Sequence, residues 1–264
     1  MNAGGPPPPQ GFEREPLPAG PDSPRQVQIR APRGKPYVTY TLMALTILVF
    51  LAQMASQFLT GEDWPALLGM KVNELILRGQ IWRLITPMFL HASIIHIGFN
   101  MYALNIFGPG LERHFGHLRF LTLYLLSAFA GNVLSFVFSL APSLGASTAV
   151  FGLLGAEGVF LYQNRELLGG SARAALTNIV TIAVINLLIG LRPGIDNWGH
   201  VGGLIGGTLF TWLGGPRLQV EGIYPSLSVS DDRESGDVVR AAIVVGALFV
   251  LIAGGIFYLR GGIR

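Results

Sequence analysis

The chain has 264 residues, of which 50% are hydrophobic and only 12% are charged, and its formal net charge is +3. Soluble globular chains carry about 25% charged residues, so this chain has too few charges to cover a water-facing surface of its size. Together with a mean hydropathy of +0.50, this composition argues against a soluble domain, a disordered protein and a nucleic-acid-binding protein, and it favours a membrane protein. The absence of cysteine excludes disulfides, cysteine-ligated metals and a thiol nucleophile.

Residues 1–36 differ from the rest of the chain. They hold ten of the 17 prolines, four of them consecutive at residues 6–9, and no aliphatic cluster. Such a segment buries too little apolar area to offset its ordering entropy, so we expect a disordered cytoplasmic tail. The first apolar run begins at Tyr37, too far from Met1 for an ordinary signal peptide, and we expect it to be a retained span.

Seven apolar runs, uncharged apart from Glu157, follow this tail. A hydrocarbon core about 30 Å thick needs about 20 helical residues; four runs meet this easily, and three are short and rich in small residues, which suits the inside of a bundle. The predicted spans are residues 37–59, 89–107, 120–140, 147–162, 174–191, 198–213 and 241–259. We therefore expect an all-α polytopic membrane helix bundle, with six spans in residues 37–214, a cytoplasmic linker over 215–240 and a seventh span with a short tail in 241–264.

Basic residues set the predicted topology. Arg25, Arg30, Arg33 and Lys35 crowd the entrance to the first span, which places the N-terminus in the cytoplasm by the positive-inside rule. Alternation from there predicts a multi-pass protein of the cell (inner) membrane. Its cytoplasmic loops then carry Arg113 and Arg119, Arg165 and Arg173, and Arg217, Arg233 and Arg240. The charged first outer loop (60–88) and the two C-terminal arginines fit this scheme less well.

Polar residues inside spans are candidates for function because they are costly there. The second, fourth and sixth predicted spans all run from outside to inside. His96, Asn100, Ser147 and His200 each fall within the first turns of one of these spans, which places them at similar depth in the outer half of the membrane. This coincidence predicts one shared cavity that is open to water on the outside.

The residues of this cavity suit acyl transfer. A serine hydroxyl needs a base to become a nucleophile, and histidine serves near neutral pH, so Ser147 and His200 form a candidate pair. Gly199, Gly203 and Gly207 form a small-residue ridge that admits a neighbouring helix. His96, Asn100 and the Ser147 amide are candidate oxyanion donors. No aspartate lies in any predicted span, so the pair would be a dyad rather than a triad.

The other polar residues are expected to have structural rather than catalytic roles. Each membrane histidine or small-residue ridge, taken alone, is more typical of helix packing than of catalysis. We expect Glu157 to snorkel toward the cytoplasm, and His114 and His117 to lie in a cytoplasmic loop, solvated or near lipid headgroups. No His-Glu-x-x-His motif is present, so we expect no metal site and no cofactor.

Five motifs together resemble those of the rhomboid family of intramembrane serine proteases, over about residues 37–213. They are Trp82-Arg83, the segment 91–100 with His91, His96 and Asn100, the segment 112–116 that begins with Glu112-Arg113, the Gly145-Ala146-Ser147 triplet, and the segment 199–207 around His200. The extra C-terminal span fits the six-plus-one arrangement of the family.

The resemblance implies a function and a site. Ser147 would attack the scissile carbonyl, and His200 would act as general base and then as acid. His96, Asn100 and the Ser147 amide would bind the oxyanion, and Phe151 would pack on the catalytic histidine. Gly145, Gly199 and Gly203 would support these residues. Substrates would be single-span membrane proteins, cut in or near the lipid bilayer.

One residue departs from the family pattern. Thr148 follows the candidate nucleophile, where the family motif has glycine, and a β-branched side chain there restricts the backbone and is expected to fill space beside the oxyanion site. This keeps open a catalytically inactive rhomboid-like protein that binds membrane helices. We favour activity because every other role is occupied. A small transporter or channel is a weaker alternative, since we see no internal repeat. The oligomeric state stays open.

Overall fold

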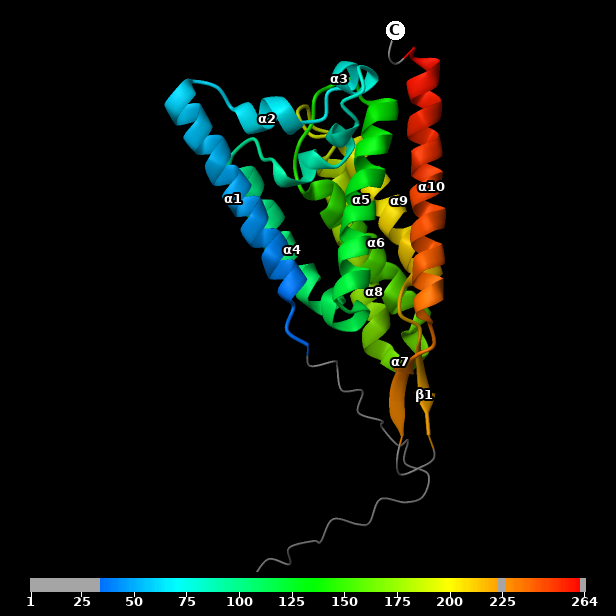
Figure 1. The fold of residues 1–264 in the computed structure, drawn as a ribbon. Coiled ribbons are helices and arrows are strands. Elements are labelled where there is room, and N and C mark those ends of the chain that lie inside the picture. Colours follow the sequence, from blue (N-terminus) through cyan, green and yellow to red (C-terminus); the bar gives the residue numbers. More distant parts are fainter. Residues whose placement is uncertain (1–33, 223–226, 262–264) are drawn as a thin grey trace, which may run out of the picture.

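The computed structural model describes residues 34–222 and 227–261, so the predicted tail lies almost entirely outside the described residues. Seven long helices dominate the fold (Figure 1). They are α1 (Tyr37–Thr60), α4 (Ile94–Phe115), α5 (His117–Phe138), α6 (Ser147–Gln163), α8 (Gly170–Ile189), α9 (Asn197–Gly214) and α10 (Ser235–Leu259). Each overlaps one predicted span. Among the described residues, α1, α5, α8 and α10 are long and apolar enough to cross a membrane by length and composition.

Helices α5, α6 and α9 form the centre of the bundle. Helix α6 buries most of its residues and α5 buries half of them, and glycines let α9 lie directly on both helices. A Cβ at Gly202 would come 2.6 Å from the Ala130 carbonyl oxygen of α5, and one at Gly207 would overlap the backbone of Gly152 in α6. In a membrane the hydrophobic effect does not drive helices together, so their association depends on close packing. The small residues of α9 allow this close packing.

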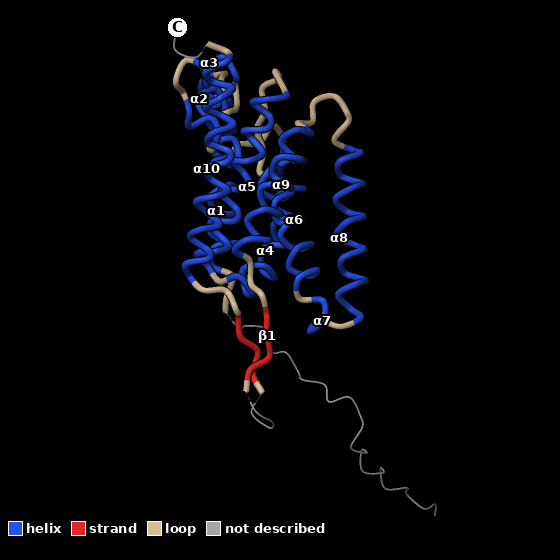
Figure 2. The backbone as a smooth tube through the Cα atoms, turned by 90° about the vertical axis from the view of Figure 1, so that its right-hand side faces the viewer, coloured by secondary structure: helices blue, strands red, loops and turns tan. Residues whose placement is uncertain are grey.

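The outer helices expose apolar side chains instead. The prediction that the short run at 174–191 lies inside the bundle is wrong: α8 buries only Ala172, Ile179 and Ala183, and Figure 2 shows it at the edge of the bundle. On α1 and α10, Leu48 and Leu251 are 62% and 73% exposed. Apolar surface of this kind suits contact with lipid.

The predicted first outer loop is largely helical. It contains α2 (Trp64–Gly69), α3 (Asn73–Leu77) and two 3₁₀ turns, η1 (Ile81–Leu84) and η2 (Thr86–Phe89). The buried Arg83 guanidinium donates to the Met70 and Leu67 carbonyls, each at 2.7 Å, and the Trp82 indole donates to Leu68 O. The Trp82-Arg83 motif thus fastens η1 to α2.

Helix α4 corrects two expectations. It begins at Ile94, not near Phe89, because Ser93 caps it by accepting a bond from the His96 amide. It also runs through Pro109 to Phe115, so only Gly116, with φ of 76°, separates it from α5. Most of the loop predicted around residues 113–119 is therefore helical.

The buried carboxylate of Glu112 explains why α4 stays helical as far as Phe115. It accepts bonds from the Val38 and Thr39 amides and from the Thr39 hydroxyl, which satisfies free N–H groups in the first turn of α1. The exposed His117 contacts the same carboxylate, with its Nδ1 2.6 Å from the Glu112 Oε1. His114, expected to be solvated or near lipid headgroups, is half-buried and packs on Phe160 with ring centroids 4.8 Å apart.

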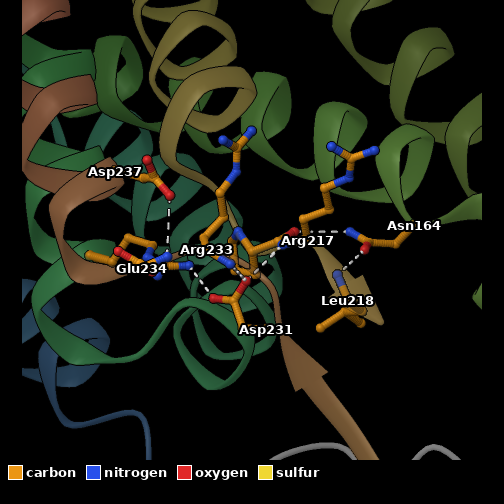
Figure 3. Close-up of polar contacts among 9 residues, drawn as sticks. Asn164, Arg217, Leu218, Asp231, Arg233, Glu234 and Asp237 are labelled. Atoms are coloured by element: carbon orange, nitrogen blue, oxygen red, sulfur yellow. Dashed lines mark hydrogen bonds and ion pairs between the residues drawn. The ribbon is translucent and has the colours of Figure 1, made fainter. Parts of the chain in front are cut away.

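The predicted linker contains the only two strands in the described residues, which depart from the expected all-α fold. Strands β1 (Leu218–Glu221) and β2 (Ser228–Asp231) pair antiparallel, with Leu218 opposite Asp231. Helix α10 then begins at Ser235, six residues before the predicted seventh span. Asn164, between α6 and the short α7 (Arg165–Leu168), anchors this hairpin by accepting the Leu218 amide at 2.6 Å and donating to Pro216 O (Figure 3).

Candidate active site

Ser147 and His200 meet at the starts of two helices. Ser147 is the first residue of α6. His200 lies one turn into α9, whose N-cap is Asp196, with its carboxylate accepting the Gly199 amide at 3.0 Å. The Ser147 Oγ and the His200 Nε2 are 3.0 Å apart. A hydroxyl and an imidazole at this distance can exchange a proton directly.

Glycine makes this contact possible. A Cβ at Gly203 would lie 2.8 Å from the carbonyl carbon of Thr148, and one at Gly199 would lie 3.0 Å from the Thr148 methyl group. Neither approach leaves room for a side chain, so α9 comes close enough to α6 for the His200 ring to reach Ser147.

Phe151 fixes the orientation of the His200 ring. It stands one turn after Ser147 on α6, and its ring stacks on the imidazole with centroids 4.2 Å apart and planes 12° apart. The His200 Nδ1 has no hydrogen-bond partner within the described residues. Stacking, rather than a carboxylate, therefore holds the ring in place.

A pocket of about 530 Å³ opens beside the pair. His96, Asp196, Ala92 and Met70 line it together with Ser147, His200 and much of the segment 139–144. His96 faces Ser147 across Gly145, which adopts φ of 132°. A Cβ on Gly145 would lie 2.7 Å from the His96 ring and 3.7 Å from the Ser147 Oγ. Gly145 therefore provides both the backbone turn and the space for the His96 ring.

Asn100 lies near this pocket but does not line it. It is buried one turn after His96 on α4, and its Nδ2 donates to the His96 carbonyl at 2.9 Å. The structure thus brings Ser147, His200 and His96 to one pocket, with Asn100 behind His96.

His91 supports the segment before Ser147. Its Nε2 accepts the Ala146 amide at 3.3 Å, and its ring meets the His96 ring edge-on with centroids 5.0 Å apart. The sequence singled out His91 only as part of the rhomboid-like segment 91–100, because nothing local shows which loop its ring contacts.

Lys71 is a residue that the sequence did not single out. Its side chain is fully buried, its Nζ donates to the Ser139 and Ala141 carbonyls at 2.7 and 2.9 Å, and its backbone pairs with Ser143. Burial lowers the pKa of Lys71 from 10.5 to about 8. Lys71 therefore holds the pocket wall that leads from α5 to Ser147.

Two further side chains fasten the same wall. Arg260, just after α10, donates to the Phe136 and Val137 carbonyls at the end of α5, where cations are favoured by the helix dipole. The Ser135 hydroxyl donates to the Asp196 carboxylate, which ties α5 to the start of α9.

The Thr148 side chain corrects an expectation. It is 5% exposed, does not line the pocket, and lies against two glycines: its Cβ would be 2.6 Å from a Cβ at Gly131, and its methyl would be 3.0 Å from one at Gly199. It fills space between α5 and α9, not space beside the candidate oxyanion site.

Other polar side chains on the apolar helices lie outside this pocket. Asn132 donates to Leu84 O and Asn186 to Ile182 O, while Glu157 is half-buried on α6. Across residues 34–222 and 227–261, no group of three or more histidine and acidic side chains is arranged to hold a metal ion.

Comparison with known proteins identifies the family. A family model described as the rhomboid domain matches residues 78–217, just over half of the chain. The chain belongs to the rhomboid family. This confirms the resemblance seen in the motifs, and with the apolar helices it makes the chain an integral membrane protein. The rhomboid match includes all the candidate site residues and leaves α1 and α10 outside it.

Several curated rhomboid relatives are similar to this chain. The rhomboid protease GluP of Bacillus subtilis (strain 168) is 45% identical over 175 residues, which are 66% of this chain and 34% of GluP. From Arabidopsis thaliana, the chloroplastic RHOMBOID-like protein 9 is 36% identical over 59% of this chain and 36% of that protein. The mitochondrial RHOMBOID-like protein 6 is 46% identical over 48% of this chain and 41% of that protein. The aligned region thus spans about a third to two fifths of the length of these relatives.

Proposed function

We propose that this protein is an intramembrane serine endopeptidase that cleaves single-span membrane proteins with a Ser147–His200 dyad. The observation that carries the proposal is the 3.0 Å contact between the Ser147 Oγ and the His200 Nε2, within a pocket that also contains His96. Membership of a family that includes the rhomboid protease GluP supports it.

The reaction begins when His200 takes the proton of the Ser147 hydroxyl as the oxygen attacks the scissile carbonyl carbon. The resulting oxyanion accepts hydrogen bonds from the Ser147 amide, which has no helical partner at the start of α6, and from the His96 ring. Asn100 does not line the pocket, and it supports this site from behind by donating to the His96 carbonyl oxygen. His200 then gives its proton to the leaving amine, and water hydrolyses the acyl-enzyme by the same steps in reverse.

The proposed topology has seven spans with the N-terminus in the cytoplasm, so the pocket opens toward the outside. Ser147, His96 and His200 then lie in the outer half of the membrane, where water for hydrolysis reaches them through the pocket. A single-span substrate would present its scissile bond at this depth.

An inactive rhomboid-like protein is the alternative that Thr148 suggested. Its side chain packs against Gly131 and Gly199 and does not line the pocket, so it leaves the attack path on Ser147 free. This packing favours the active form of the proposal.

The proposal is tested by reconstituting the full chain in lipid vesicles with a panel of single-span membrane proteins. Wild type should cleave at least one of them, and Ser147→Ala and His200→Ala should each lower its rate by at least about 1,000-fold. Ser139→Ala is the matched control, because Ser139 lines the same pocket and its hydroxyl makes no hydrogen bond within the described residues. Cleavage by Ser147→Ala at the wild-type rate would refute the proposal.

A further inference from the structure

A second pocket lies at the end of the bundle opposite Ser147, where α6 and α9 end beside the hairpin. Its volume is about 670 Å³, within the roughly 300–1,000 Å³ typical of small-molecule sites. Arg165, Arg217 and Arg233 line it, with Glu166 and Asp232 as the lining acids. Basic side chains therefore outnumber acidic ones.

Two of these guanidinium groups lack acidic partners. The Arg217 side chain makes no hydrogen bond or ion pair within the described residues. Arg233 donates to Trp212 O at 3.0 Å, while its Nε is buried without a partner among the residues described. Figure 3 shows both side chains extending in the same direction, away from the strand drawn below them.

Asp231 does not neutralise them, although it lies between them in the chain. One of its carboxylate oxygens accepts the backbone amides of Arg217 and Arg233, at 2.9 and 3.0 Å, and the other pairs with Arg119 at 2.7 Å. Asp232 and Glu166 are exposed and form no ion pair within the described part of the chain. Asp231 is therefore occupied by the hairpin backbone and by Arg119, so the guanidinium groups of Arg217 and Arg233 are available to a ligand.

Two aromatic residues indicate the level in the membrane at which this pocket lies. Tyr162, near the end of α6, and Trp212, near the end of α9, both line it and stack with centroids 6.0 Å apart. They are 45% and 49% exposed, and such half-exposed Tyr and Trp side chains are typical of the headgroup level of a membrane. The Arg165 guanidinium lies over the Tyr162 ring, 4.5 Å from its centroid.

We propose that this pocket binds the phosphate group of an anionic phospholipid in the leaflet on the side of the hairpin. The planar fork of arginine matches phosphate oxygens in a bidentate manner, and basic pockets between helices at this depth recognise lipid headgroups. The aromatic pair favours a lipid over free phosphate, because it places the arginines where headgroups are concentrated. A bound lipid would hold the ends of α6 and α9 to the hairpin, far from the catalytic pocket.

The full chain, purified in a neutral detergent, tests this with native mass spectrometry, which counts bound lipid. It is titrated separately with phosphatidylglycerol, phosphatidylcholine and inorganic phosphate. Wild type should bind one phosphatidylglycerol at concentrations where phosphatidylcholine and inorganic phosphate do not bind. The double variant Arg217→Gln/Arg233→Gln should weaken phosphatidylglycerol binding about tenfold or more.

Arg113→Gln is the matched control, because Arg113 is an exposed arginine at the same end of the bundle that does not line the pocket. It should bind phosphatidylglycerol like wild type, and an unchanged melting temperature without lipid confirms that each variant is folded. Equal binding of phosphatidylglycerol and phosphatidylcholine, or undiminished binding by the folded double variant, would overturn the proposal. Equal occupancy by inorganic phosphate would overturn the assignment to a lipid. None of these results depends on proteolysis, so the proposed function is tested separately.

Discussion

Replacing Gly203 with alanine should separate the two candidate catalytic residues without touching either. The new Cβ would overlap the Thr148 carbonyl oxygen and lie 2.8 Å from its carbonyl carbon, whereas ordinary van der Waals contact begins at 3.4 Å. Because the obstacle is helix backbone, α9 has to move by more than about 0.6 Å, the shift that would relieve the contact with the carbon alone. His200 lies one turn before Gly203, so a shift of this size away from α6 would lengthen its 3.0 Å contact with Ser147 beyond about 3.6 Å, which is no longer a hydrogen bond.

The expected effect on catalysis follows from this displacement. A general base contributes about 10²- to 10⁴-fold to a rate, and a misplacement of about 1 Å can reduce a rate 10²-fold. Gly203→Ala should therefore lower the initial rate of cleavage in lipid vesicles by about 100-fold, measured on a substrate that wild type cleaves and corrected for the folded fraction.

Gly254→Ala serves as the matched control for Gly203→Ala. Gly254 lies on α10, and a Cβ there meets nothing within 4 Å, so the cleavage rate should stay at the wild-type level. Because alanine favours a helix more than glycine does, the free energy of unfolding should rise by at most about 1 kcal/mol. A folded Gly203→Ala protein that cleaves within threefold of the wild-type rate would show that this close approach does not position the dyad.

Three further predictions follow from single side chains. Phe151→Leu removes the stack on His200 and keeps an apolar side chain, so the cleavage rate should fall about three- to tenfold, and an unchanged rate would show that the stack does not orient the ring. Thr148→Gly loses packing against Gly131 and adds a glycine to a helix, so its melting temperature should fall, by an amount equivalent to at least about 1 kcal/mol, with no gain in cleavage; a large gain would instead show that Thr148 limits the enzyme. Burial lowers the pKa of Lys71 to about 8 from its ordinary value of 10.5. The positive charge on this amine therefore destabilises the folded state, fully below pH 8 and progressively less as the pH rises to 10.5. The melting temperature in detergent should therefore rise more over that interval in wild type than in Lys71→Met, and equal changes would contradict a buried, titrating Lys71.

The sequence predicted the helices because apolar runs are a local signal. All seven predicted spans correspond to long helices, and the largest errors fall where distant contacts decide the boundary. Residues 108–119 were expected to be a loop because the predicted apolar spans end at 107 and resume at 120, but α4 continues to Phe115, where Glu112 is buried against the first turn of α1. The sequence of α4 alone does not show that α1 needs this carboxylate.

The central part of the candidate site was predicted for a similar reason. Ser147, His96 and His200 stand out because polar residues are rare in apolar spans, and alternating topology placed them at one depth. Lys71 and Asp196 were missed because both lie in loops, where charged residues are ordinary. Only their contacts with Ser139 and Ser135 show that they hold the pocket wall.

Thr148 shows a further limit of sequence reasoning. Its identity raised the alternative of an inactive protein, but a sequence does not show in which direction a side chain points. The close approach of Gly131 and Gly199 provides the space for this threonine between α5 and α9.

The most direct test of the proposed dyad is covalent labelling of the full chain by a fluorophosphonate probe, which needs no known substrate. Wild type should be labelled on Ser147, as identified by peptide mass spectrometry, and labelling should be lost in Ser147→Ala and at least about 100-fold slower in folded His200→Ala. Labelling of wild type and Ser147→Ala to the same extent, or no labelling of folded wild type, would contradict the assignment of Ser147 as the nucleophile.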